Sequence, residues 1–114
     1  MKKVVKRLYE GMYIINANLS EDARKKALEK ITQSIEAKDG EIHKIHDWGK
    51  RRLAYEINKK REGYYYILYF SIPSTKILEI TKEYQLHEDL IRFLTLKAEA
   101  VQESLEFKPS EQHS

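Results

Sequence analysis

The side chains in two segments of the chain recur at the spacing of an α-helix. Between Ser20 and Gly40, apolar residues fall on one helical face and charged residues on the others. Ser20 predicts the N-cap, and Asp39-Gly40 predicts the end of the helix, with the glycine in the left-handed conformation. After Pro73, a second stripe predicts a helix from Ser74, as its cap, to about Leu86. The stripe positions are Ala23, Ala27, Leu28, Ile31 and Ile35 in the first helix and Ile77, Ile80, Thr81 and Tyr84 in the second.

Four other segments have the composition or the alternation of β-strands. Leu8–Asn16 and Tyr64–Ile72 are dense in aromatic and branched residues, which predicts largely buried strands. Glu41–Asn58 alternates in two stretches around Gly49, which predicts one long strand with a bulge or kink at the glycine. The polar residues 58–63 predict a hairpin connection, and Leu90–Lys97 predicts a last strand.

The predicted order is therefore strand, helix, strand, strand, helix, strand. Two right-handed β-α-β units that share a hairpin give the α+β, ferredoxin-like β-α-β-β-α-β split fold, a four-stranded antiparallel sheet with two helices on one face. We expect residues 1–97 to form this domain, with the second strand at a sheet edge and the other sheet face uncovered. Residues 98–114 contain four glutamates and one lysine, and they predict an acidic, disordered C-terminal tail.

Composition narrows the class of protein further. A chain of 114 residues is long enough for one domain with a single hydrophobic core. The absence of cysteine excludes disulfide scaffolds, zinc knuckles and thiol nucleophiles. No apolar run approaches the length of a membrane helix, and the first residues do not resemble a secretory signal. We therefore expect a cytoplasmic protein.

The positive charge is concentrated in two clusters. The net charge is only +3, but the segment 50–61 holds six cations and one anion, and four further cations lie in the first seven residues. Two such clusters on a small domain indicate a polyanionic partner, of which nucleic acid is the simplest. A solvated charged surface without a partner is the alternative interpretation.

The sequence offers little for catalysis. His43 and His46 lie three residues apart, which on a regular strand places them on opposite faces and argues against a shared metal. The four glycines are too dispersed to form a phosphate-binding loop. We therefore expect no enzyme activity, no cofactor, no metal and no small-molecule substrate.

The third predicted strand resembles a motif of RNA-recognition modules. Gly63–Tyr69 follows the pattern of the first ribonucleoprotein motif, whose aromatic side chains stack on bases, and Met12–Asn16 resembles the partner motif. Glu62 stands where the motif has a basic residue, and Tyr65 stands where it has a small one. Aromatic packing in a central strand explains the same residues.

The second predicted strand carries a more specific signature. Gly49-Lys50-Arg51-Arg52-Leu53-Ala54-Tyr55-Glu56-Ile57-Asn58 resembles the signature of the family of bacterial ribosomal protein six of the small subunit. The resemblance extends over roughly Arg7 to Lys97. It implies the same fold and a structural, non-catalytic, ribosome-bound role in the cytoplasm. It also implies binding to the central domain of small-subunit ribosomal RNA together with ribosomal protein eighteen of that subunit.

The RNA-binding candidates follow from charge, and the partner candidates follow from the resemblance, which implies that a second small-subunit protein packs near the second strand. The RNA-binding candidates are Lys50, Arg51, Arg52, Lys59, Lys60, Arg61, Arg92, Lys2 and Lys3. The candidates for contact with the protein partner are Trp48, Leu53 and Ile45, with Trp48 the favoured anchor. Two alternatives stay open, a free-standing RNA-recognition module and a ferredoxin-like protein–protein module that binds no RNA.

Overall fold

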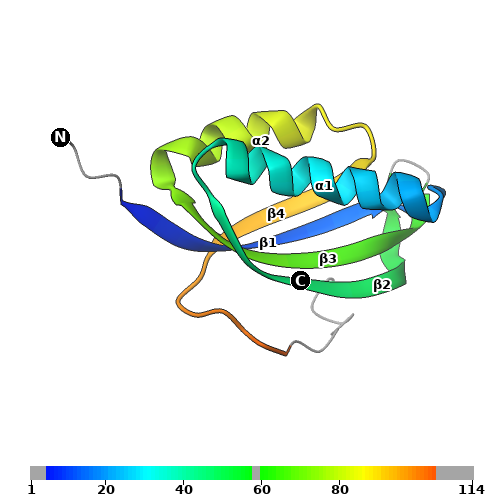
Figure 1. The fold of residues 1–114 in the computed structure, drawn as a ribbon. Helices are drawn as coiled ribbons and strands as arrows, with labels where there is room; N and C mark the ends of the chain where they lie inside the picture. The colour runs from blue at the N-terminus through cyan, green and yellow to red at the C-terminus, as the bar shows by residue number, and fades with distance from the viewer. Residues whose placement is uncertain (1–4, 58–59, 105–114) are drawn as a thin grey trace.

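Four antiparallel strands and two helices make up the fold (Figure 1). The computed structural model describes residues 5–57 and 60–104. The strand order is β2-β3-β1-β4, so the first and third strands are central and the second lies at an edge, as predicted. Both helices lie on one face, which confirms the ferredoxin-like split fold. The elements are β1 (Lys6–Asn16), α1 (Glu21–Ala37), β2 (Glu41–Ile57), β3 (Lys60–Pro73), a 3₁₀ turn (Ser74–Lys76), α2 (Ile77–Gln85) and β4 (Leu90–Lys97).

The main core lies between the helices and the sheet. Alternate residues of β1 and β3 point toward the helices and meet buried side chains such as Ile31 of α1 and Ile80 of α2. Within it, the hydroxyls of Tyr13 and Tyr84 form a buried hydrogen bond of 2.8 Å, and their rings meet edge to face. Such a pair satisfies both hydroxyls inside an apolar layer, which would otherwise be costly.

The first helix begins as predicted and ends differently. The Ser20 hydroxyl accepts a hydrogen bond of 3.2 Å from the Ala23 amide, which confirms the N-cap. At the other end Asp39, not Gly40, has a positive φ, of 64°. The glycine is needed for space, because a Cβ there would lie 2.5 Å from Ile35 Cγ2 and 2.6 Å from the Ile35 carbonyl oxygen.

The second helix begins one turn later than predicted. Residues Ser74–Lys76 form a 3₁₀ turn, and α2 starts at Ile77 without a side-chain cap. The prediction that Ser74 caps this helix was therefore wrong. Pro73 is the last residue of β3, and the 3₁₀ turn follows it directly. Ser74 therefore lies inside that turn and not immediately before the helix.

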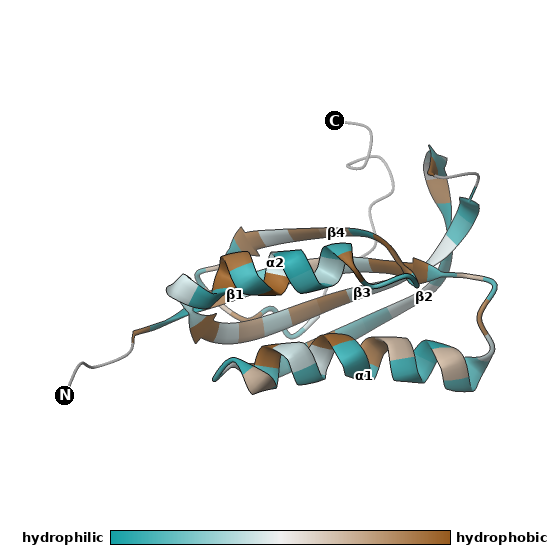
Figure 2. Ribbon diagram, turned by 90° about the horizontal axis from the view of Figure 1, so that it is seen from above, coloured by the Kyte–Doolittle hydropathy of each residue, from teal (hydrophilic) through white to brown (hydrophobic). Residues whose placement is uncertain are grey.

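The third strand is longer than the sequence predicted, and the bulge in the second strand lies where it was expected. Gly49 has a φ of 73°, and the β2–β3 register shifts between Asp47 and Gly49, which confirms the bulge. However, β3 begins at Lys60 rather than Tyr64, so most of the predicted connection is strand. Because β1 ends where Asn16 pairs with Gly63, the strands beyond that point form a projecting hairpin (Figure 2). We call residues 50–57 and 60–62 the basic hairpin.

Seven described residues follow β4. Residues 98–104, the tail segment, lie on the face of the sheet opposite the helices, which we call the open face (Figure 1). The Ala98 amide donates to the Leu8 carbonyl at 3.0 Å. No helix in the described ranges is long and apolar enough to cross a membrane.

Candidate nucleic-acid and partner interface

A small apolar cluster holds the basic hairpin against the open face. Leu53 of β2 is 8% exposed and packs with Ile14 of β1 and Tyr65 of β3. Met12, Trp48, Ile57 and Ile91 pack around these three as half-buried neighbours. Apolar burial of this kind fixes the hairpin relative to the sheet. Leu53, a candidate for partner contact, is therefore buried inside the isolated chain.

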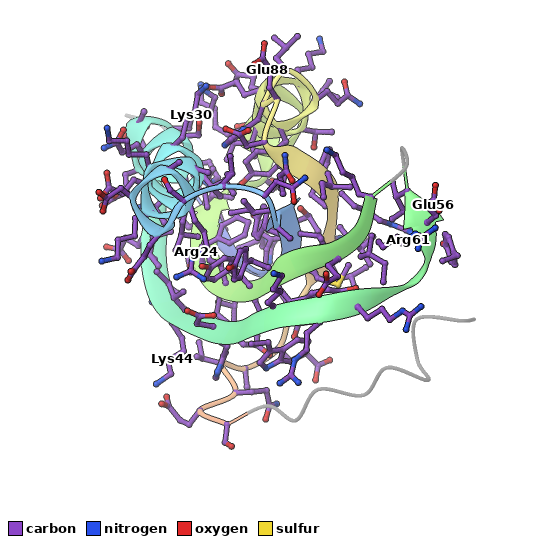
Figure 3. The ribbon with its side chains drawn as sticks, turned by 90° about the vertical axis from the view of Figure 1, so that its right-hand side faces the viewer. Arg24, Lys30, Lys44, Glu56, Arg61 and Glu88 are labelled. Atoms are coloured by element: carbon purple, nitrogen blue, oxygen red, sulfur yellow. The ribbon has the colours of Figure 1, made fainter. Side chains whose placement is uncertain are left out.

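The hairpin presents cations to solvent. Lys50, Arg51, Arg52 and Arg61 are all exposed. Arg61 Nε lies 3.6 Å from a carboxylate oxygen of Glu56, at the end of the hairpin (Figure 3). Arg51 Nε donates to the Trp48 carbonyl at 3.0 Å. An open groove of about 360 Å³ lies between Arg52, Leu53, Tyr55, Glu56 and Arg61.

Arg92 joins this surface from the far edge of the sheet. Its Nη1 donates a 2.8 Å hydrogen bond to the Tyr55 hydroxyl of the hairpin. The sequence suggested Arg92 only as a basic position. No local pattern indicated a contact with Tyr55, which lies 37 residues away in the sequence. Lys60 lies half-buried at the start of β3. Three other candidates, Lys2, Lys3 and Lys59, lie outside the described residues.

The remaining partner candidates lie on both sides of the edge strand. Trp48 is half-buried and packs with the cluster on the open face. Ile45 pairs with Leu68, whose side chain belongs to the helix-facing core, and it is 41% exposed. A protein that follows this edge can therefore contact an apolar side chain on each side of β2.

The aromatic strand does not present bases with a stacking surface. Tyr64 and Tyr66 point toward the helices and pack in the main core, while Tyr69 on the open face is completely buried. The guanidinium of Arg24, which the sequence did not single out, stacks on Tyr64 with Cζ 4.1 Å from the ring centroid. The aromatic residues of the motif are thus used in packing.

Both histidines contact the open face, in contrast to the prediction. The register of β2 shifts between Ile42 and Lys44, which turns His43 toward Ser71, with Nε2 and Oγ 2.7 Å apart. His46 packs edge to face on Tyr69. Across the described ranges, no group of three or more histidines and acidic residues is placed to hold a metal ion.

The fold defines a small α+β protein of the ferredoxin-like class with a basic hairpin that projects beyond the sheet. A family model described as Ribosomal protein S6 matches residues 8–97. The chain belongs to the ribosomal protein S6 family, as the sequence signature indicated.

Individual relatives agree with this result. The chain is 56% identical over 108 residues to the small ribosomal subunit protein bS6 of Protochlamydia amoebophila, covering 95% of each chain. It is 57% identical over 107 residues to the bS6 protein of Chlamydia caviae, covering 94% of this chain and 96% of that one. The crystal structure of 30S ribosomal protein S6 from Thermotoga maritima superposes with a TM-score of 0.78 at 34% identity, covering 82% of this chain and 89% of that chain.

Membership of this family defines the setting in which the chain acts. It is a structural protein of the small ribosomal subunit and not an enzyme. It is accordingly cytoplasmic, ribosome-bound and part of a ribonucleoprotein that contains ribosomal RNA.

Proposed function

We propose that the chain binds the central domain of small-subunit ribosomal RNA through the basic hairpin. The observation that carries this proposal is the exposure of Lys50, Arg52 and Arg61 on a hairpin held by apolar packing. Lysine and arginine supply affinity through RNA phosphates and set the register, but they read no sequence. Specificity then comes from the shape of the folded RNA and from a protein partner.

Neutralising the hairpin cations tests this proposal. We expect the triple variant Lys50→Gln, Arg52→Gln and Arg61→Gln to bind a central-domain RNA fragment more weakly. The slope of log affinity against log salt should flatten by up to about 0.9 for each phosphate that the variant no longer neutralises on a duplex-like backbone. Filter binding at four salt concentrations measures both quantities.

A control variant separates a local contact from a general loss of charge. Lys26 and Lys30 on α1 and Lys82 on α2 are exposed, and both helices lie on the face of the sheet opposite the open face. Replacing these three lysines by glutamine removes the same number of charges as the hairpin variant. The slope of log affinity against log salt should stay close to that of the wild type. Equal slopes in the two triple variants would contradict the hairpin as the RNA surface. Wild-type protein that binds protein eighteen but no RNA would favour the protein–protein module.

We also propose that ribosomal protein eighteen of the small subunit binds along β2. An exposed edge strand is available for contact, and Trp48 and Ile45 flank it as half-exposed apolar side chains. Tryptophan is enriched among residues that dominate binding energy. Trp48 is accordingly the proposed anchor, while Leu53 supports it from inside the cluster.

Replacing Trp48 by alanine tests the anchor. We expect a loss of affinity for protein eighteen of about 30-fold, the effect of an interface residue worth about 2 kcal/mol. Ile91→Ala disturbs the same apolar cluster from β4, away from the proposed edge, and serves as the control. It should lower the unfolding free energy and leave the affinity unchanged. If Trp48→Ala behaves like the control, Trp48 is a packing residue and the partner docks elsewhere.

A further inference from the structure

The tail segment crosses the open face from the central strand β1 to the edge strand β2. It leaves β4 beside Leu8 of β1, where the Ala98 amide makes its hydrogen bond. Four residues later the Gln102 carbonyl accepts a 2.7 Å hydrogen bond from His46 Nε2 on β2. The Gln102 backbone N–H also faces the Tyr69 hydroxyl of the intervening strand β3, where it lowers the pKa of that hydroxyl against the larger effect of burial. The segment therefore follows one defined path across three strands.

An ion pair holds the far end of this path. The Glu103 carboxylate lies 3.4 Å from Nζ of Lys44, which points away from the helices (Figure 3). Beneath the segment, the Tyr69 hydroxyl donates a hydrogen bond of 2.5 Å to the Glu10 carboxylate, which faces Tyr69 rather than the tail. The groups that meet the segment, Lys44 and His46, are thus a cation and a hydrogen-bond donor.

The same groups suit a phosphate. A lysine and an imidazole N–H bind phosphate oxygens by the contacts that they make here with a carboxylate and a carbonyl oxygen. The cations Arg51 of the basic hairpin and Arg92 of β4 lie on the same face of the sheet. The open face therefore continues the positive surface of the basic hairpin, but the tail segment covers part of it and adds Glu99 and Glu103.

We infer that the tail segment is an intramolecular competitor that occupies Lys44 and His46 in place of RNA phosphates. This inference rests on the proposed RNA binding by the hairpin. Tethering keeps the segment at a high effective concentration. An exposed ion pair contributes little, so RNA can displace the segment at a modest cost in affinity. The tail thereby reduces binding of the open face to non-cognate polyanions, which have no cognate shape to offset that cost.

Charge reversal in the full-length chain tests the competition. Glu103→Lys breaks the pair with Lys44, and Glu99→Lys makes the same charge change at an exposed position of the same segment. We expect Glu103→Lys to bind a mixed-sequence RNA duplex about threefold more tightly than Glu99→Lys does, the effect of losing one exposed ion pair. If the two variants bind the duplex with equal affinity, the change in net charge alone explains the tighter binding, and the inference is overturned.

Amide hydrogen exchange gives a readout that needs no RNA. In the wild type, the Ala98 and Gln102 amides should both be protected from exchange. In Glu103→Lys, the Gln102 amide should lose its protection. In the double swap Lys44→Glu with Glu103→Lys, it should be protected again. Exchange of both wild-type amides at the rate of an unfolded chain overturns the inference and leaves hairpin binding intact. If the amides are protected but the protein binds no RNA, the proposed RNA binding is refuted, and so is competition between the tail segment and RNA. The tail segment would still be shown to lie on the open face.

Discussion

Leu53→Ala tests whether the apolar cluster positions the basic hairpin. The substitution removes the branched end of a side chain that is 8% exposed and packs with Ile14 and Tyr65. Buried Leu→Ala substitutions cost about 2–5 kcal/mol, and the cost falls where the surroundings can close the cavity. Among the described side chains, this cluster has three buried members, and it lies where the hairpin leaves the sheet. We therefore expect a loss near the lower limit, about 2–3 kcal/mol.

Guanidinium unfolding of the full-length chain measures this loss. Leu78→Ala is the matched control, because it deletes the same atoms from a side chain on α2 that is 65% exposed. The control should change the free energy of unfolding by less than about 0.5 kcal/mol. A loss below about 1 kcal/mol for Leu53→Ala would show that this side chain does not anchor the hairpin.

RNA binding separates positioning from charge in the same variant. Leu53→Ala keeps every cation, so the salt slope should stay close to that of the wild type whenever the hairpin is bound. Affinity should nevertheless fall, because a detached hairpin has to be ordered on binding. Unchanged affinity together with a clear loss of stability would mean that the cations act without a fixed arrangement.

Two predictions concern the core. Burial raises the pKa of Tyr13 and of Tyr84 above the value of about 10 for an unfolded tyrosine. Their contribution to stability is therefore complete below pH 10 and is lost above it, by about 1.4 kcal/mol per pH unit for each tyrosine. Guanidinium unfolding between pH 8 and about 11.5 should show this decline, and the Tyr13→Phe and Tyr84→Phe double variant should show less of it; equal slopes would contradict the assignment. Gly40→Ala should cost about 1–3 kcal/mol in thermal unfolding, because the new methyl meets the Ile35 carbonyl. A loss below about 0.5 kcal/mol would show that the loop relaxes freely.

Local patterns were sufficient to predict the order of the elements. The helical stripe after Ser20, the aromatic strands and the bulge at Gly49 each depend on side chains that are neighbours in the sequence. Once their order is known, the handedness of β-α-β units places β2 at an edge. The family signature is also local, because one continuous segment of the sequence, residues 49–58, carries it.

Contacts between distant segments decided the features that the sequence did not predict. Asp39 and Gly40 both tolerate a positive φ, and the approach of Ile35 determines which residue must be the glycine. The face of His43 depends on a bulge that carries no glycine to mark it. The hydrogen bond from Arg92 to Tyr55 joins β4 and β2, the two edge strands. These strands meet only because the hairpin bends over the open face.

The features that keep the edge strand β2 from pairing with other chains are also the features that suit it to binding RNA. An edge strand of 17 residues would expose a long row of unpaired backbone groups to other chains. In β2, the bulge at Gly49 interrupts that row, and the charges of Lys50, Arg51 and Arg52 oppose pairing with a second copy. Those charges do not oppose a polyanion, and the bulge directs the strand over Ile14, where Leu53 anchors it. The strand therefore disfavours self-association and favours RNA through the same residues.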